Sequence, residues 1–375
     1  MICEKIPAMT RYPLARSGIL ALTLFTLMLW HGTSQAKGKP RPPAQPTMLQ
    51  NTAVVDFIQQ MSERHGFDAE VLSSHFRDQR PDMRIIRIMA PSPTQTTPNW
   101  QAYRKRFVNS RRIERGLQFW DTYADTLEKA SREYGVPPEI IVAIIGVETE
   151  YGRNMGSFNV LNALASIGFY GERRRDFFQT ELEQYLLLAR DNAMDLESTR
   201  GSFAGALGIP QFMPSSQRRW GVDYDGDQRI DLIHSPIDAI GSVANFFKSH
   251  GWVQGAATVI TVTPPIPLPA VFDKVDVNPG IPLWQYREAG FEFSTPLPDR
   301  TLATLVTLTS PQAPTETWLG LNNYYVITRY NRSAAYAMSV IELGNAIREI
   351  REAMAATQSS QQGIGRQLSP PDNPL

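Results

Sequence analysis

The feature that most constrains the fold is a run of mostly apolar residues, 138–152, that opens with proline and ends with glycine. Proline suits the first turn of a helix, where its missing amide costs nothing, and Gly152 suits the end of one. At 3.6 residues per turn, Ile141, Ile144 and Ile145 form a single apolar stripe. The run therefore predicts a helix whose apolar stripe faces the core.

One carboxylate lies on that stripe. Glu148 follows Ile144 and Ile145 by four and three residues, so its side chain is expected to point the same way. Because apolar surroundings disfavour the ionised form, such a carboxyl tends to keep its proton near neutral pH and can act as a general acid. The alternative is a structural carboxylate paired with an arginine or with backbone amides. Glu150, about 200° further around the helix, is expected to face water.

The N-terminus has the three parts of a secretory signal: a basic beginning, an apolar run (18–30) and small residues at a cleavage site (34–36). The apolar run is too short for a comfortable membrane span, although an uncleaved anchor is the alternative. The single cysteine, Cys3, precedes the run, whereas a lipoprotein carries its cysteine immediately after it. We therefore expect a periplasmic protein with no lipid anchor and no stable membrane span after cleavage.

Charge and motif content exclude several classes of function. The chain has 37 basic and 37 acidic residues, and loss of the signal, with three basic residues and one acidic, leaves a net charge near −2. This balance offers no electrostatic footprint for nucleic acid. The five histidines show no zinc-binding spacing, and the G-x-S-x-G motif of serine hydrolases does not occur.

Composition and periodicity predict an α+β protein that is mainly α. Five segments are expected: a signal peptide (1–36), a flexible leader (37–50), a helical catalytic region (51–255 plus 329–354), a small inserted β-rich segment (256–328) and a disordered tail (355–375). Within the helical region, the apolar pattern predicts one long helix at 113–134.

An acidic loop at 223–238 has the character of an EF-hand loop. Its candidate oxygen ligands are the carboxylates of Asp223, Asp225 and Asp227, the carbonyl of Arg229 and, from the start of the next helix, the carboxylate of Asp238. Such oxygens suit a hard cation such as Ca²⁺. Two positions depart from the EF-hand pattern, because Gln228 replaces a glycine and His234 replaces a bidentate glutamate. The alternative is an acidic surface turn without metal.

Three further segments carry side chains suited to a ligand. The glycine-rich loop 201–216 offers Ser202 and Gln211 as hydrogen-bonding groups, or is only a tight connector. Arginines at 173–175 open a helix, where cations oppose the macrodipole, so either an anionic partner or solvent is expected there. Residues 324–336 are dense in aromatic and hydrogen-bonding groups, which suits either saccharide binding or core packing.

Taken together, these motifs resemble the lytic murein transglycosylase B family over about residues 50–354, in order. The segments that carry the resemblance are Gly146–Gly152, Gly201–Gly205, Pro210–Ser216, the loop from Asp223, Asp238–Asn245, His250–Trp252 and Ile327–Ser333.

The resemblance implies a lysozyme-like helical core with flanking helices and a small β domain. It also implies cleavage of the β-1,4 bond between N-acetylmuramic acid and N-acetylglucosamine of peptidoglycan, leaving 1,6-anhydro ends, without a cofactor for catalysis. Glu148 matches the sole catalytic acid and base, Arg173 and Arg174 match residues facing the acidic peptide stem, and the Asp223 loop matches a structural calcium site. The positions that match the saccharide groove are Tyr103, Ser202, Gln211, Tyr330, Asn331 and Tyr336.

Two alternatives stay open at this point. A hydrolytic muramidase would use the same acid but let water attack the sugar. A non-catalytic scaffold of the cell wall would hold the glycan in the same groove without cutting it.

Overall fold

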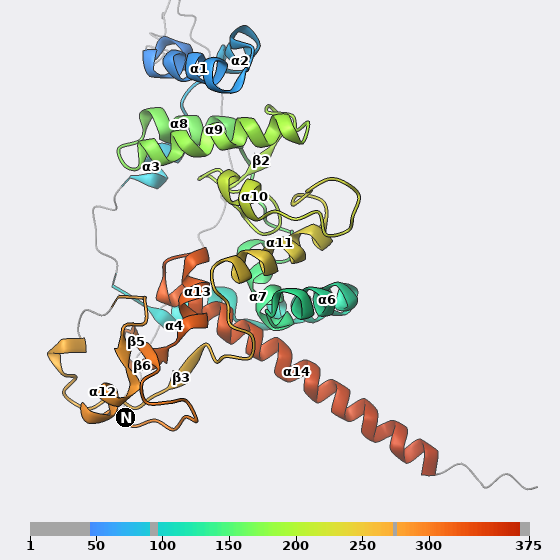
Figure 1. Ribbon diagram of the computed structural model, residues 1–375, viewed down its shortest axis with the longest axis vertical. Helices are drawn as coiled ribbons and strands as arrows, with labels where there is room; N and C mark the ends of the chain where they lie inside the picture. The colour runs from blue at the N-terminus through green and yellow to red at the C-terminus, as the bar shows by residue number, and fades with distance from the viewer. Residues whose placement is uncertain (1–45, 91–96, 273–275, 368–375) are drawn as a thin grey trace, which may run out of the picture. The chain divides into compact units, whose positions relative to one another are not determined.

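The computed structural model describes residues 46–90, 97–272 and 276–367, with side chains up to residue 357. The expected signal peptide, most of the leader (37–50) and the last residues of the tail lie outside this range. Within it, helices predominate over two small sheets, which confirms the mainly helical α+β class (Figure 1). None of the described helices combines the length and hydropathy that a membrane crossing needs.

The helices alternate with short loops along most of the described chain (Figure 1). They are α1 (Thr52–His65), α2 (Ala69–Phe76), α3 (Met83–Met89), α4 (Trp100–Phe107), α5 (Ser110–Thr122), α6 (Ala124–Tyr134), α7 (Pro138–Thr149), α8 (Val160–Tyr170), α9 (Arg175–Asp191), α10 (Pro214–Trp220), α11 (Pro236–Ser249), α12 (Leu283–Glu288), α13 (Asn322–Tyr330) and α14 (Ala334–Gln367), with two 3₁₀ turns at Met48–Gln50 and Ala270–Phe272.

Helix α7 is the centre of the largest buried cluster. It begins at Pro138, as the proline pair predicts, and Ile141, Ile144 and Ile145 are completely buried. Around it pack α5, α6, α11 and α14, and Figure 1 draws α7 beside α6 and α11. Since four helices cover it, α7 is apolar on nearly every side, which is the pattern of a core helix.

Two other clusters have their own buried residues. One is formed mainly by α1, α8 and α9, with Leu164 and Tyr185 among its fully buried side chains. The other fills the β-rich segment around Tyr286 and Phe291, whose rings meet edge to face with centroids 5.3 Å apart.

The β-rich segment contains a four-stranded antiparallel sheet in the order β3-β6-β5-β4, made of Val259–Thr261, Ala313–Gly320, Leu302–Ser310 and Ile281–Pro282. The register places Ile260 beside Leu319, and both side chains are buried in the segment's own core. Outside these strands, Glu292 and Thr263 form an isolated antiparallel bridge. A second, two-stranded sheet joins β1 (Phe158–Asn159) to β2 (Arg200–Gly201).

Three expectations about the elements differ from the structure. The single helix expected at 113–134 is two helices, because Tyr123 leaves the helical conformation (φ −117°, ψ 29°). Tyr123 is both the C-cap of α5 and the N-cap of α6. Helix α13 begins at Asn322, inside the segment expected to be β-rich, where the Asn323 amide donates to the carbonyls of Val253 and Ala256.

The tail expected to be disordered from residue 355 is helical as far as Gln367 in the described chain. Alanine and glutamine are good helix formers, so α14 continues where composition alone suggested disorder.

Candidate active site

Glu148 lies in the last turn of α7, partly buried as a residue, and its neighbours Ile144 and Ile145 are fully buried. The Tyr336 hydroxyl donates a hydrogen bond of 2.5 Å to Glu148 Oε1. Burial raises the pKa of Glu148 to about 7, and the bond from Tyr336 opposes that rise. The side chain therefore exchanges a proton near neutral pH, as a general acid must.

Three tyrosines predicted for the groove come together near this carboxyl. Tyr330 ends α13 and Tyr336 lies in the first turn of α14. Their rings are stacked, with centroids 6.5 Å apart and planes inclined by 15°. Burial and the charge of Glu148 raise the pKa of Tyr330 well above its usual value, and the same two causes raise that of Tyr103 on α4. All three phenols therefore stay neutral at physiological pH and act as hydrogen-bonding groups.

The glycine-rich loop is fastened to the end of α7. The Thr149 hydroxyl donates to the Ile209 carbonyl over 2.7 Å, and Tyr330 donates its hydroxyl to the Pro210 carbonyl. Gln211 adopts a left-handed conformation (φ 52°), with its amide nitrogen donating to the carbonyls of Gly208 and Met155. Gln211 therefore directly follows the residue that Tyr330 contacts, and its side chain stays partly exposed.

Ser202 lies at the other end of that loop. Its hydroxyl accepts a hydrogen bond of 2.9 Å from the Ala206 amide and closes the turn there. A neighbouring close approach depends on glycine, because a Cβ on Gly156 would lie 2.0 Å from the Gly201 carbonyl oxygen. The loop and the segment that precedes β1 therefore meet backbone to backbone beside Ser202.

Arg173, Arg174 and Asn331 are all exposed. Arg174 is the residue before α9, in a left-handed conformation (φ 57°), and its guanidinium lies 3.9 Å above the ring of Phe177. Asn331 directly follows α13. No hydrogen bond or ion pair joins these three side chains to Glu148 in the part of the chain that the structure describes.

The prediction that Glu150 faces water was wrong. Its side chain is 4% exposed and forms ion pairs with Arg111, Arg112 and Arg115 of α5. Helical counting failed because Glu150 is left-handed (φ 52°), beyond the last helical residue. The signal that could have found these partners is the spacing of the three arginines, which gives α5 a basic face in need of an acidic partner.

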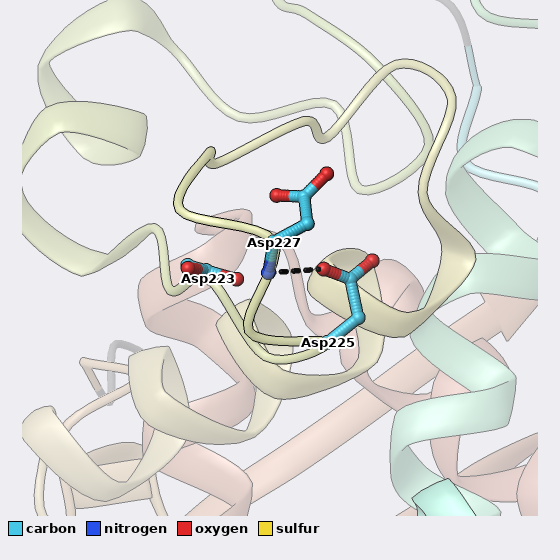
Figure 2. A group of neighbouring side chains, drawn as sticks. All are labelled: Asp223, Asp225 and Asp227. Carbon is cyan, nitrogen blue, oxygen red and sulfur yellow. Dashed lines mark hydrogen bonds between the residues drawn. The ribbon is translucent and has the colours of Figure 1, made fainter.

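The acidic loop gathers three of its predicted ligands. One carboxylate oxygen from each of Asp223, Asp225 and Asp227 lies within 4.8 Å of the others, and Figure 2 shows the three side chains around one turn of the loop. Within that turn the Asp227 amide donates to Asp225 over 3.3 Å. Three convergent carboxylates offer hard oxygen ligands of the kind that a divalent cation such as Ca²⁺ binds.

Two other predicted ligands have different surroundings. Asp238 is 1% exposed, and its oxygens accept hydrogen bonds from the amides of Tyr224, Asp225 and Asp231. It therefore holds the loop from inside and lies outside the three-aspartate cluster. Arg229 has an exposed side chain, and its amide donates to Asp227.

Comparison with known proteins identifies the family. The family model "Transglycosylase SLT domain" matches residues 50–345. The chain is 42% identical over 307 residues to the membrane-bound lytic murein transglycosylase B of Escherichia coli K12, across 79% of this chain and 83% of that one.

Two solved structures agree with this match. The soluble lytic transglycosylase SltB1 of Pseudomonas aeruginosa is 43% identical, with a TM-score of 0.75 over 80% of this chain and 99% of its own. The Escherichia coli lytic transglycosylase Slt35, solved in complex with calcium, is 41% identical, with a TM-score of 0.74 over 82% of this chain and 96% of its own. The chain therefore belongs to the SLT-domain lytic transglycosylases, enzymes of lysozyme-like fold that act on peptidoglycan.

Proposed function

We propose that Glu148 alone supplies the acid and the base of the transglycosylase reaction. In the first step its carboxyl gives a proton to the glycosidic oxygen, and the bond from that oxygen to C1 of N-acetylmuramic acid breaks. In the second step the carboxylate takes the proton of the C6 hydroxyl of the same sugar while that oxygen bonds to C1. The products are a free N-acetylglucosamine hydroxyl and a 1,6-anhydro end.

The observation that carries this proposal is a carboxyl whose pKa burial raises to about 7 and that accepts a 2.5 Å hydrogen bond from Tyr336. A group with that pKa is populated in both protonation states near neutral pH, so it can donate in one step and accept in the next. Glycosidases that hydrolyse their substrate commonly use a second carboxylate. The carboxylate two residues away, Glu150, is held in arginine ion pairs and is unsuited to that role.

For the substrate, the proposal assigns the glycan strand to the surface around Glu148. Neutral phenols and amides bind sugar hydroxyls, and stacked tyrosines offer flat apolar faces to sugar rings. The side chains assigned to the strand are those of Tyr103, Ser202, Gln211, Tyr330, Asn331 and Tyr336. The exposed Arg173 and Arg174 are assigned to the carboxylates of the peptide stem, because guanidinium groups pair well with carboxylates.

For the metal, the proposal assigns Ca²⁺ to the oxygens of Asp223, Asp225 and Asp227. Their mutual approach within 4.8 Å fits one cation between them, and without a cation their charges repel one another. When bound, the ion contributes charge neutralisation to the loop that precedes α11. It takes no part in the proton transfers of Glu148.

For the location, the proposal places the enzyme in the periplasm. Peptidoglycan is its substrate, and residues 1–36 have the pattern of an export signal.

The direct test is Glu148→Gln in the full chain, assayed by the loss of turbidity of purified cell walls and by sedimentation with those walls. We expect lysis to disappear and wall binding to remain, since glutamine keeps the shape of the side chain. Glu139→Gln is the matched control, because Glu139 lies in the first turn of the same helix and pairs with Arg348. Normal lysis by Glu148→Gln would remove Glu148 from the mechanism, and wall binding without lysis by the wild type would favour the scaffold.

A further inference from the structure

The turn that follows Glu148 is clamped from α5 through a buried carboxylate. Glu150 accepts bonds from Arg111 and Arg115, and its second oxygen lies 3.8 Å from Arg112 Nη2 and 3.2 Å from the Asn154 amide nitrogen. A buried charge is costly unless it is paired, so the Glu150 carboxylate depends on these partners to stay buried. The reaction proposed above makes no use of it.

Arg112 joins the same cluster to the backbone on the other side of Glu148. Its Nη1 donates to the Gly146 carbonyl over 2.6 Å and to the Val147 carbonyl over 3.4 Å. A carbonyl oxygen can accept two hydrogen bonds, and the Gly146 carbonyl accepts one from the Glu150 amide as well as the one from Arg112. A cation at this end of the helix is also favoured by the helix dipole. One guanidinium therefore holds the residues before Glu148, and through Glu150 it also holds those after it.

The backbone between these two attachments is unusual. Glu150 and Tyr151 are both left-handed (φ 52° and 63°), a conformation that is unfavourable for residues other than glycine. The Tyr151 hydroxyl donates to the Arg112 carbonyl, and its ring occupies the space above Gly116 and Gly146. The turn thus keeps an unfavourable backbone because side-chain contacts with α5 hold it.

We propose that Glu150 and Arg112 are positioning residues that fix the direction of the Glu148 carboxyl toward Tyr336 and the glycosidic oxygen. Neither touches the substrate. The inference rests on the proposed role of Glu148, and it adds that contacts with α5 complete the last turn of α7 beyond the helix's own hydrogen bonds.

The test uses Glu150→Gln and Arg112→Lys in the full chain, with kcat, KM and the pH profile measured on sonicated peptidoglycan. We expect kcat to fall roughly 10- to 100-fold with KM little changed, because a displacement near 1 Å is enough for such a loss. The alkaline limb of the profile should move toward lower pH in both variants, as a loosened turn admits water to Glu148.

Two features separate positioning from other effects. Arg112→Lys keeps every charge, so a shifted limb in that variant cannot come from an altered field. The double variant should lose little more than either single one, because both substitutions break one unit. Glu181→Gln is the matched control for stability: Glu181 is also buried (3% exposed), bonds to Ser215 at the start of α10, and should lower the melting temperature without moving the pH limb.

Folded Glu150→Gln and Arg112→Lys proteins with wild-type kcat and pH profile would overturn this inference. If Glu150→Gln does not fold, Arg112→Lys alone decides it. Failure of the proposed function is recognised separately, because in that case Glu148→Gln itself remains active.

Discussion

Replacing Glu148 by glutamine should stabilise the protein, and only at neutral to alkaline pH. The wild-type carboxyl must ionise inside a largely desolvated site, which is why burial raises its pKa from 4.5 to about 7. A glutamine has no charge to lose, yet its carbonyl oxygen can still accept the bond from the Tyr336 hydroxyl. The burial that lets Glu148 act as an acid near neutral pH therefore also lowers the stability of the folded protein at that pH.

The sign and size follow from linkage. Below pH 4.5 the carboxyl is protonated in both the folded and the unfolded chain, so it costs nothing. As the pH rises from 4.5 to about 7 the unfolded chain ionises first, and stability is lost until the folded carboxyl ionises too. A pKa shift of this size corresponds to at most about 3 kcal/mol in the free energy of unfolding. Because the Glu148 residue is partly exposed, we expect the substitution to add about 1–3 kcal/mol to that free energy.

Thermal melting of wild type and Glu148→Gln at pH 4.5 and pH 8 measures this effect. The variant should melt roughly 2–6 °C higher than the wild type at pH 8 and equally at pH 4.5. Glu139→Gln serves as the control, since Glu139 lies in the first turn of α7. A variant that is less stable than the wild type at pH 8, or that gains equally at both pH values, would refute the reasoning about the buried carboxyl.

Three further predictions concern the surroundings of the site. In Tyr336→Phe the bond that lowers the pKa of Glu148 is gone, so the alkaline limb of the pH–rate profile should move upward, and an unmoved limb would show that the bond does not tune the acid. Chelation of Ca²⁺ should lower the melting temperature of the wild type but not that of Asp223→Asn, with activity at moderate temperature affected less; identical melting curves would discard the calcium assignment. Gly146→Ala should destabilise the protein by about 1–3 kcal/mol in denaturant unfolding, because its Cβ would lie 2.5 Å from the Tyr151 hydroxyl oxygen, and a wild-type midpoint would contradict that packing.

The elements that sequence could predict are those with strong local signals. Helix α7 begins at its predicted proline, α1 ends at His65 before a left-handed Gly66, and the β-branched run from Leu302 forms β5. The expectation for Glu148 rested on the stripe of Ile144 and Ile145, because position on a helix face needs no knowledge of the rest of the fold.

What sequence could not predict depends on contacts between distant segments. The break at Tyr123 has no proline or glycine to mark it. The start of α13 depends on a hydrogen bond from the Asn323 side chain to the Val253 carbonyl, 70 residues earlier in the chain. Glu150 was misjudged because helical periodicity stops where the backbone turns left-handed, and its three arginines lie 35 to 39 residues away along the chain. Tertiary pairing of this kind leaves only a weak trace in one sequence.

The central claim is that one carboxyl, Glu148, both protonates the leaving oxygen and activates the sugar's own hydroxyl. Mass spectrometry of purified peptidoglycan digested in water labelled with heavy oxygen tests it most directly. The account predicts that the wild type releases fragments with unlabelled 1,6-anhydro ends, lighter by one water than hydrolytic ends, and that Glu148→Gln releases none. Labelled reducing ends from the wild type, or anhydro fragments from Glu148→Gln, would contradict it.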